Sequence, residues 1–293
     1  MTTDLPEPKN SSPRQSKPSW LKVSYTINEN YKEIRTIVHQ HNLHTVCEEA
    51  FCPNIGECWR RRAATLMILG QVCTRNCRFC AVRNGQPLPP DPDEPEKVGG
   101  AVNLMRLKYA VITSVTRDDL PDGGAEHWAK TIQAIRDQNP HCKIEVLIPD
   151  FQGNFRALDI VLSAKPDVLG HNLETVKSLY PTVRPKADYR LSLQVLKHAK
   201  EQGFITKTGI MIGLGETREQ VTELMQDART VGCDIFTAGQ YLQPTKAHLP
   251  VQRYVTLEEF ELITKEGLKM GFRAMMAEPL VRSSYHAEET MAS

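Results

Sequence analysis

Short apolar segments alternate with amphipathic ones along most of this 293-residue chain, and the alternation limits the folds open to it. The apolar segments have the length and composition of buried strands, and they span residues 65–69, 109–115, 143–148, 167–170, 206–212 and 234–238. Helical patterns lie between them, for example over residues 125–137, 189–202 and 218–231. Such strands predict a parallel sheet with at least one helix-covered face. Six units of this kind fit an α/β fold, either a partly closed barrel or a doubly wound sheet, and both bind ligands at the carboxyl ends of their strands.

Six of the eight cysteines form two triplets of unequal spacing. The first triplet is Cys47, Cys52 and Cys58, and the second triplet is Cys73, Cys77 and Cys80. Three thiolates can hold three irons of a cubic [4Fe–4S] cluster and leave the fourth iron free for another ligand. Zinc is the competing interpretation, but zinc sites usually combine two Cys-x2-Cys pairs into four tetrahedral ligands. The odd number and uneven spacing favour two iron–sulfur clusters, one of them in the loop after the first predicted strand.

Composition and charge argue against several other classes of protein. The formal net charge of +1, from 36 basic and 35 acidic residues, gives no support to a nucleic-acid partner. No apolar segment reaches membrane-spanning length, and residues 1–19 lack the apolar core of a signal peptide, so we expect a cytoplasmic protein that is not associated with a membrane. Clustered cysteines in a reducing compartment are typical of metal ligands. Residues 1–20, rich in Pro and Ser, are expected to form a disordered tail.

The second triplet lies in the sequence Cys-Thr-Arg-Asn-Cys-Arg-Phe-Cys at residues 73–80. This loop resembles the Cys-x3-Cys-x-aromatic-Cys signature of radical S-adenosylmethionine (SAM) enzymes. Taken with the first triplet and with Arg-Ser-Ser-Tyr at residues 282–285, it resembles the lipoyl synthase family. Further stretches that resemble this family lie at residues 113–124, 170–175, 209–216 and 241–245, so the match covers about residues 21–290. Asn76 and Ala81 depart from the commonest pattern and put no ligand position in doubt.

The resemblance implies a partial (β/α)6 TIM-type barrel with an N-terminal cluster-binding extension and a C-terminal closing segment. In sequence order, we expect residues 1–20 to be the tail, 21–62 the extension for the auxiliary cluster, 63–252 the radical SAM barrel and 253–293 the segment with Arg-Ser-Ser-Tyr. That last segment must return to the N-terminal extension to meet the first triplet. We therefore expect the two ends of the chain to lie together over the mouth of the barrel.

The resemblance also implies a chemistry. A saturated alkyl chain has no acidic proton, so acid–base groups cannot activate it, whereas a radical cofactor can. The family inserts sulfur at carbons six and eight of an octanoyl chain held on a lysine of a lipoyl-domain protein, such as a dehydrogenase acyltransferase subunit or the glycine-cleavage H protein. The implied cofactors are two [4Fe–4S] clusters and SAM. The implied partners also include an electron donor, such as flavodoxin or ferredoxin, and a protein that rebuilds the consumed cluster.

Each triplet has its own role in this scheme. The second triplet would hold the cluster whose open iron chelates SAM, and an electron from that cluster would release the 5′-deoxyadenosyl radical that removes hydrogen from the substrate. The first triplet would hold the auxiliary cluster, which is consumed as the sulfur source. The resemblance gives the auxiliary cluster Ser283 as its fourth ligand, and it gives Arg282 and Ser283 catalytic roles.

Six further residues are expected to contact SAM: Phe79, Asn172, Glu174, Arg184, Arg190 and Gly213. Each has an ordinary structural alternative. Phe79 would pack over the adenosine or simply within its own loop, and Gly213 would let the backbone approach a nucleoside or form a plain turn. Asn172 and Glu174 would bond the ribose or amino acid of SAM, or begin a helix. The two arginines would meet the SAM carboxylate or stay solvated.

Two other functions stay open from the sequence. The first is another radical enzyme with an auxiliary cluster, such as a peptide-modifying or methylthio-transferring enzyme, and the Arg-Ser-Ser-Tyr segment argues against it. The second is a two-cluster electron carrier. Such carriers are generally compact and have four cysteines for each cluster, whereas this chain has two triplets and a whole barrel besides.

Overall fold

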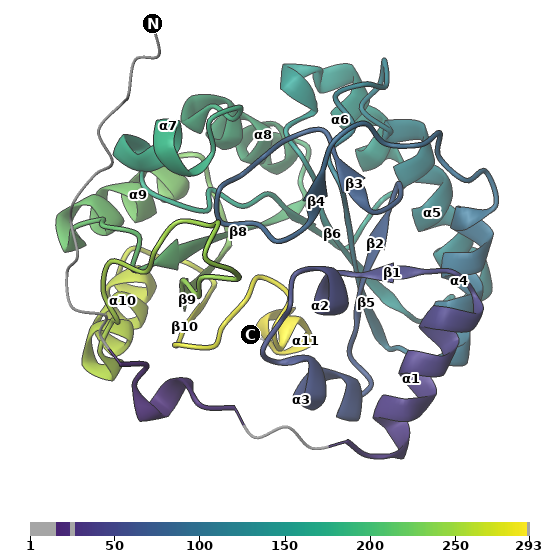
Figure 1. Ribbon diagram of the computed structural model, residues 1–293. Coiled ribbons are helices and arrows are strands. Elements are labelled where there is room, and N and C mark those ends of the chain that lie inside the picture. The colour runs from purple at the N-terminus through teal and green to yellow at the C-terminus, as the bar shows by residue number, and fades with distance from the viewer. Residues whose placement is uncertain (1–15, 24–26, 292–293) are drawn as a thin grey trace, which may run out of the picture.

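The computed structural model describes residues 16–23 and 27–291, and its main sheet has the strand order β1-β2-β5-β6-β7-β8-β9-β10 (Figure 1). The strands that run parallel are β2 (Thr65–Ile68), β5 (Tyr109–Ser114), β6 (Lys143–Leu147), β7 (Val168–Gly170), β8 (Ile205–Ile212), β9 (Ile235–Gln240) and β10 (Ala274–Ala277). β1 (His44–Thr45) pairs antiparallel with β2. A separate parallel pair joins β3 (Val72–Cys73) to β4 (Arg83–Asn84).

The strand order decides between the two folds that the sequence leaves open. A doubly wound sheet reverses its strand order at a switch point, whereas β2 to β10 follow one another in the order of the chain. The sheet curls in Figure 1, and within the described residues β1 and β10 form its two edges. The fold is therefore the expected partial barrel, and this barrel is open along the side between β1 and β10.

Helices connect the parallel strands and lie around the outside of the curved sheet (Figure 1). They are α4 (Glu94–Leu104), α5 (Ala125–Gln138), α6 (Phe155–Ser163), α8 (Tyr189–Glu201), α9 (Arg218–Thr230) and α10 (Leu257–Lys269). Shorter turns are η2 (Phe151–Gly153), η3 (Lys177–Leu179) and α7 (Tyr180–Val183). Apolar side chains such as Trp128 and Leu224 are buried between these helices and the sheet. None of the described helices is long and apolar enough to span a lipid bilayer.

Local signals fix where two of these helices begin. The hydroxyl of Thr217 accepts a hydrogen bond from the backbone N–H of Gln220, whose side chain accepts one from the Thr217 N–H. Thr256 and Glu259 make the same reciprocal pair at the start of α10. Such capping boxes satisfy N–H groups that a helix start leaves without partners.

The N-terminal extension contains η1 (Ser19–Leu21), α1 (Glu29–Gln40), α2 (Val46–Glu49) and α3 (Ile55–Arg60). Tyr31 of α1 packs against Trp59 of α3, with ring centroids 5.0 Å apart and the ring planes tilted by 41°. Of the expected disordered tail, residues 1–15 lie outside the described residues, whereas Ser19 and Trp20 belong to η1. The C-terminal segment adds α10 and β10 to the barrel wall before it reaches α11 (Ala287–Met291), so it does more than close the barrel.

All six predicted strands are present, with ends that differ by one or two residues from those expected. The sequence analysis missed β1 and β10 of the main sheet and the separate pair β3 and β4. β10 has the sequence Ala-Met-Met-Ala, which lacks β-branched residues and favours helix. It becomes a strand because it pairs with β9, where Ala274 lies opposite Ile235.

Candidate active site

The second triplet lies in residues 69–85, which follow β2 and which we call the cysteine loop. The loop begins with two residues in the left-handed region, Leu69 (φ 67°) and Gly70 (φ 90°), so the chain turns sharply away from the sheet. Two buried charged side chains hold this turn. The carboxylate of Glu94 accepts from the N–H of Leu69 at 2.7 Å, and Arg117 donates to the Leu69 carbonyl oxygen at 3.3 Å. The cysteine loop thus begins at the carboxyl end of β2, as predicted.

The middle of the cysteine loop is tied to the far side of the barrel mouth. The backbone N–H of Arg78 donates to the Val183 carbonyl at 3.0 Å, and its carbonyl accepts from the N–H of Leu249 at 3.1 Å. Phe79 packs against the apolar cluster that contains Tyr241. Phe79 therefore packs against residues outside the cysteine loop. Its contact with adenosine stays a prediction.

The thiols of the second triplet are half-buried in the cysteine loop. Burial raises the pKa of Cys80 to about 12, and it raises the pKa of Cys77 against the opposing effect of the Arg184 guanidinium. The sulfur of Cys73 accepts backbone N–H bonds from Arg75 at 3.4 Å and from Thr116 at 3.3 Å. Thiols with raised pKa values bind metal only by giving up their protons, so metal binding at this loop should release protons.

Three of the residues expected to contact SAM lie near Cys77, in and after the turn that follows β7. They are Asn172, Glu174 and Arg184. Arg184 is buried, and its Nη1 donates to the carbonyl oxygen of Asn172 at 2.9 Å. The side-chain amide of Asn172 donates to the Glu174 carboxylate at 3.1 Å. Burial raises the pKa of Glu174, and the nearby Arg184 opposes that rise. The charges of Arg184 and Glu174 also act on the thiol of Cys77.

Several buried polar atoms in this group have no hydrogen-bond partner among the described residues. They are Asn172 Oδ1, Arg184 Nε and His171 Nε2. Leaving a buried polar atom without a hydrogen-bond partner costs about 1–3 kcal/mol of stability, so such atoms usually bond to water or to a ligand. These acceptors and donors, set beside three thiols, fit the polar amino-acid and ribose groups of SAM.

Gly213 and Arg190 do not join this group. The N–H of Gly213 donates to the buried carboxylate of Glu216 at 2.7 Å, and a Cβ on Gly213 would lie 2.3 Å from Gln240 Nε2. With φ at 106°, Gly213 has the role of a plain turn, which needs glycine at this position. Arg190 is exposed at the start of α8. Contacts of these two residues with SAM stay predictions.

The thiols of the first triplet lie on the wall of one cavity, together with residues from the end of the chain. The same wall includes Thr65, Tyr109 and Val111, which lie in β2 and β5. Thr65 and Tyr109 are the first residues of their strands, so the cavity reaches the end of the sheet opposite the mouth. Burial raises the pKa of Cys47 to about 12 and also raises the pKa values of Cys52 and Cys58. The cavity of the first triplet therefore extends from the starts of β2 and β5 to the segment that follows β10.

Direct contacts hold the C-terminal segment against the N-terminal extension. The side-chain amide of Asn54 donates to the carbonyl oxygen of Leu280 at 2.7 Å, across 226 positions in the sequence. The hydroxyl of Tyr285 donates to the Glu57 carboxylate at 3.0 Å. Figure 1 shows α11 beside α2 and α3. The expected meeting of the two ends of the chain is confirmed, and it bridges the two edges of the sheet because the extension leads into β1 and the C-terminal segment follows β10.

The serine that meets the first triplet is Ser284. It lies on the wall of the cavity with the three cysteines, whereas Ser283 is not among the lining residues. Ligation of the auxiliary cluster by Ser283, which the family resemblance implies, stays a prediction. Successive residues in a turn direct their side chains differently, and the sequence Arg-Ser-Ser-Tyr does not by itself show which serine faces inward.

Arg282 lies between the two cysteine sites. Its pKa is lowered by burial, and the partners that oppose this are Cys52 of the first triplet and Glu174 beside the second. Its Nη1 donates to the carbonyl oxygen of Val281 at 2.7 Å. Gly239 in β9 makes room for this backbone, because a Cβ there would lie 2.0 Å from the Val281 carbonyl oxygen. The Arg282 guanidinium can therefore act on charges at both sites.

The donor sets at both sites suit iron–sulfur clusters. Among the described residues, no group of three or more His, Cys, Asp or Glu side chains is arranged to hold a single metal ion. A cubic cluster takes its ligands on different irons, so the thiolates need not converge on one point. Three thiols with a serine hydroxyl line one site, and three thiols lie beside unpartnered polar atoms at the other.

Comparison with known proteins agrees with this geometry. Residues 67–228 match the profile described as "Radical SAM superfamily". Among solved structures, the chain is similar to SuiB from Streptococcus suis bound to S-adenosylmethionine (TM-score 0.59, 13% identity, 76% of this chain and 53% of that one). It is also similar to methylornithine synthase (TM-score 0.51, 15% identity, 75% and 72%). The barrel and the cysteine loop thus define a radical SAM protein.

The family within that superfamily follows from closer relatives. Residues 3–52 match the profile of the N-terminal domain of lipoyl synthase. The lipoyl synthase of Bacteroides fragilis (strain YCH46) is 54% identical over 276 residues, which cover 94% of this chain and 96% of the relative. The lipoyl synthase of Chlorobaculum parvum is 54% identical over 281 residues, which cover 95% and 96%. The chain belongs to the lipoyl synthase family. This membership implies a [4Fe–4S] cluster, SAM and a lipoyl-domain protein substrate.

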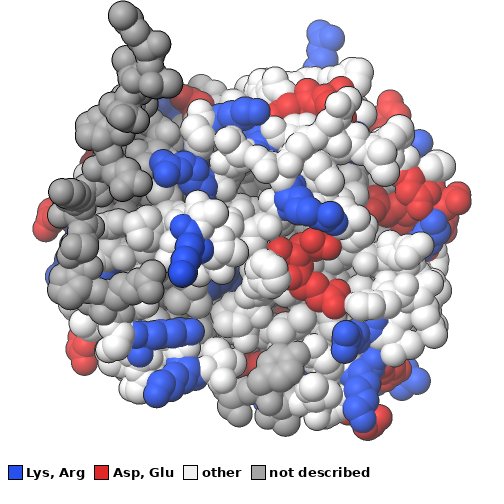
Figure 2. All heavy atoms as spheres, viewed as in Figure 1, with Lys and Arg blue, Asp and Glu red and all other residues white. Residues whose placement is uncertain are grey.

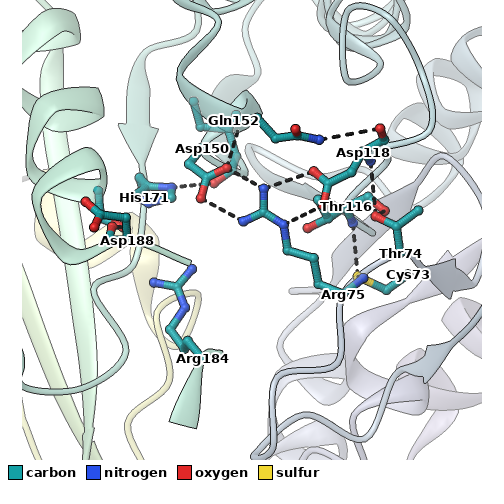
Figure 3. Close-up of polar contacts among 12 residues, drawn as sticks. Cys73, Thr74, Arg75, Thr116, Asp118, Asp150, Gln152, His171, Arg184 and Asp188 are labelled. Carbon is teal, nitrogen blue, oxygen red and sulfur yellow. Dashed lines mark hydrogen bonds and ion pairs between the residues drawn. The ribbon is translucent and has the colours of Figure 1, made fainter. Parts of the chain in front are cut away.

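Arg75 of the cysteine loop and its two partners, Asp118 and Asp150, were not among the expected site residues (Figure 3). Only their positions in the sequence could have marked these three residues as part of the site. Arg75 lies between two cysteines of the second triplet, and each aspartate follows a predicted strand.

Proposed function

We propose that this chain inserts two sulfur atoms at carbons six and eight of an octanoyl chain on a lipoyl-domain protein, and that the two triplets hold clusters with different tasks. The observation that carries this proposal is the cavity shared by the first triplet and Ser284. A simple electron carrier has no need of a second, separate site closed by the other end of the chain. A site of this kind suits an enzyme that brings a second reagent to a radical centre.

The second triplet would hold the cluster that binds SAM through its open iron. When bound, the cluster and SAM supply a radical able to remove hydrogen from an unactivated carbon. The chain's own residues would bind and orient SAM. Asn172 Oδ1 and Arg184 Nε offer an acceptor and a donor, and Phe79 fixes the cysteine loop across the mouth.

The first triplet would hold the auxiliary cluster, which is a substrate of the reaction because it gives up sulfur. We assign its fourth ligand to Ser284 in place of Ser283, because Ser284 shares the cavity with the three thiols. A serine oxygen is an unusual ligand for an iron–sulfur cluster beside cysteine thiolates, so it suits a cluster that must come apart. Arg282 would place a positive charge between the two sites, because its guanidinium interacts electrostatically with Cys52 and with Glu174.

The partners follow from this chemistry. The carrier would be an octanoylated acyltransferase subunit or H protein, the electron donor a flavodoxin or ferredoxin, and a further protein would rebuild the auxiliary cluster. Both basic and acidic side chains lie on the face shown in Figure 2. We place the enzyme in the reducing cytosol, where the thiols stay available for cluster assembly.

The test is a count of clusters combined with an assay of both half-reactions. The full-length chain, reconstituted without oxygen, should hold about eight irons, four at each site. Mössbauer spectra of this protein and of a variant with alanines at the second triplet should separate two clusters, one of them with a non-cysteine ligand. On reduction, the protein should form 5′-deoxyadenosine and convert an octanoylated carrier. Full conversion by protein that holds one cluster would contradict the two-cluster proposal, and reduction without 5′-deoxyadenosine would favour the electron carrier.

A further inference from the structure

Arg75 lies within the second triplet's loop, but its side chain is only 5% exposed. Its guanidinium bonds two carboxylates at once. Nε and Nη2 donate to the two oxygens of Asp118 at 2.8 and 2.9 Å, and Nη1 and Nη2 donate to those of Asp150 at 2.7 and 2.6 Å. Figure 3 shows the guanidinium between the two aspartates. Paired bonds of this kind fix the plane of the guanidinium as well as its position.

The two aspartates belong to different strand connections. Asp118 lies in the loop after β5, and Asp150 lies after β6, directly before η2. Arg75 therefore ties the cysteine loop, which follows β2, to the next two strand ends of the barrel. Asp150 is itself held, because its side chain is 2% exposed and accepts from the N–H of Gln152 at 2.9 Å. Asp150 is thus held by a backbone N–H as well as by Arg75.

The same short segment holds the sulfur of Cys73. The backbone N–H groups of Arg75 and Thr116 donate to Cys73 Sγ at 3.4 and 3.3 Å. The hydroxyl of Thr74 joins this network, since it accepts from the N–H of Asp118 at 3.1 Å and donates to the Thr116 carbonyl at 3.0 Å. Arg75 thus supplies one of the two N–H donors to the sulfur, and its side chain is held by the two aspartates.

Hydrogen bonds to a ligating sulfur matter for electron transfer. They stabilise the extra negative charge of a reduced iron–sulfur cluster, so they raise its reduction potential. A donor at 3.4 Å from sulfur is sensitive to small movements of the backbone. Movement of the Arg75 side chain would change the distance from its own N–H to Cys73 Sγ.

We infer that Arg75 is a positioning residue, which holds Cys73 Sγ between two backbone donors and thereby sets the reduction potential of the cluster at the second triplet. The inference rests on the proposed ligation of that cluster by the second triplet. The role belongs to the planar fork of Arg75 and not to its charge alone. A lysine would keep the charge, but it could not make two bidentate pairs.

The test uses substitutions that conserve charge. In the full-length chain with alanines at the first triplet, only one cluster contributes to the electron paramagnetic resonance spectrum. Arg75→Lys should make reduction of this cluster about tenfold less favourable, a fall of about 59 mV in midpoint potential for one electron. Asp118→Glu should lower the potential in the same direction, and its partly exposed site tolerates the longer side chain. Arg136→Lys is the matched control, because Arg136 bonds Asp167 just before β7, at the opposite end of the sheet.

The outcomes separate this inference from the proposed function. A midpoint potential in Arg75→Lys equal to that of the parent chain, with about four irons bound, would overturn the inference and leave the proposed function standing. If Arg75→Lys fails to retain its cluster, Asp118→Glu decides: a lowered potential supports the inference, and an unchanged one overturns it. A parent chain that binds no cluster at the second triplet would overturn both.

Discussion

The substitution Asn54→Ala should loosen the C-terminal segment from the first triplet. Asn54 is 2% exposed, and its amide donates to the Leu280 carbonyl at 2.7 Å. Loss of such a bond costs about 0.5–1.5 kcal/mol, and a buried carbonyl left without a donor costs about 1–3 kcal/mol. Leu280 is half-buried, so the low end of this sum applies, about 1.5 kcal/mol. The segment should then detach about tenfold more often than in the parent chain.

The assay is the rate at which a chelator removes iron from the auxiliary site, in a full-length chain with alanines at the second triplet. Because detachment opens the cavity, Asn54→Ala should lose iron about tenfold faster. Asn139→Ala is the matched control, since Asn139 also donates its amide to a backbone carbonyl, that of Gly99 at 3.0 Å, between α4 and the end of α5. Equal rates of iron loss in the two variants would refute the reasoning.

Three further predictions concern single side chains. Ser284→Ala should block sulfur insertion while 5′-deoxyadenosine still forms, and Ser283→Ala should leave both intact, as mass spectrometry of an octanoylated carrier would show. Thr217→Ala removes the cap of α9 and should lower the free energy of unfolding by about 1 kcal/mol in urea, with no loss of iron. Burial lowers the pKa of His171 from 6.5 to about 4, so the folded state resists protonation and apoprotein stability should fall as the pH drops from 6.5 towards 4. His171→Asn should flatten that fall in the thermal unfolding midpoint, and an unchanged pH profile would contradict the assignment.

Six strands of the main sheet and the position of the cysteine loop after β2 could be predicted because their signals are local. Apolar runs such as that of β5 predict buried strands wherever they stand, and the spacing of each cysteine triplet is read directly from the sequence. β10 could not be predicted in this way. Ala-Met-Met-Ala favours helix, and only pairing with β9 makes it a strand.

The parts of the site that the sequence did not predict depend on contacts between distant residues. Whether Ser283 or Ser284 faces the first triplet is decided by the turn that follows β10. The place of the first triplet depends on β1, whose two antiparallel residues attach the extension to the edge of the sheet. The paired hydrogen bonds of Arg75 require Asp118 and Asp150, which lie 43 and 75 positions further along the chain. No local pattern contains such information.

The central claim is that one cluster starts the radical and the other is consumed as the sulfur source. In the most direct measurement, the auxiliary cluster is rebuilt with heavy-isotope sulfide. The mass of the lipoyl group formed on an octanoylated carrier protein is then determined after a single turnover. We predict that both sulfur atoms of the product carry the label. Complete conversion with unlabelled sulfur would contradict the account.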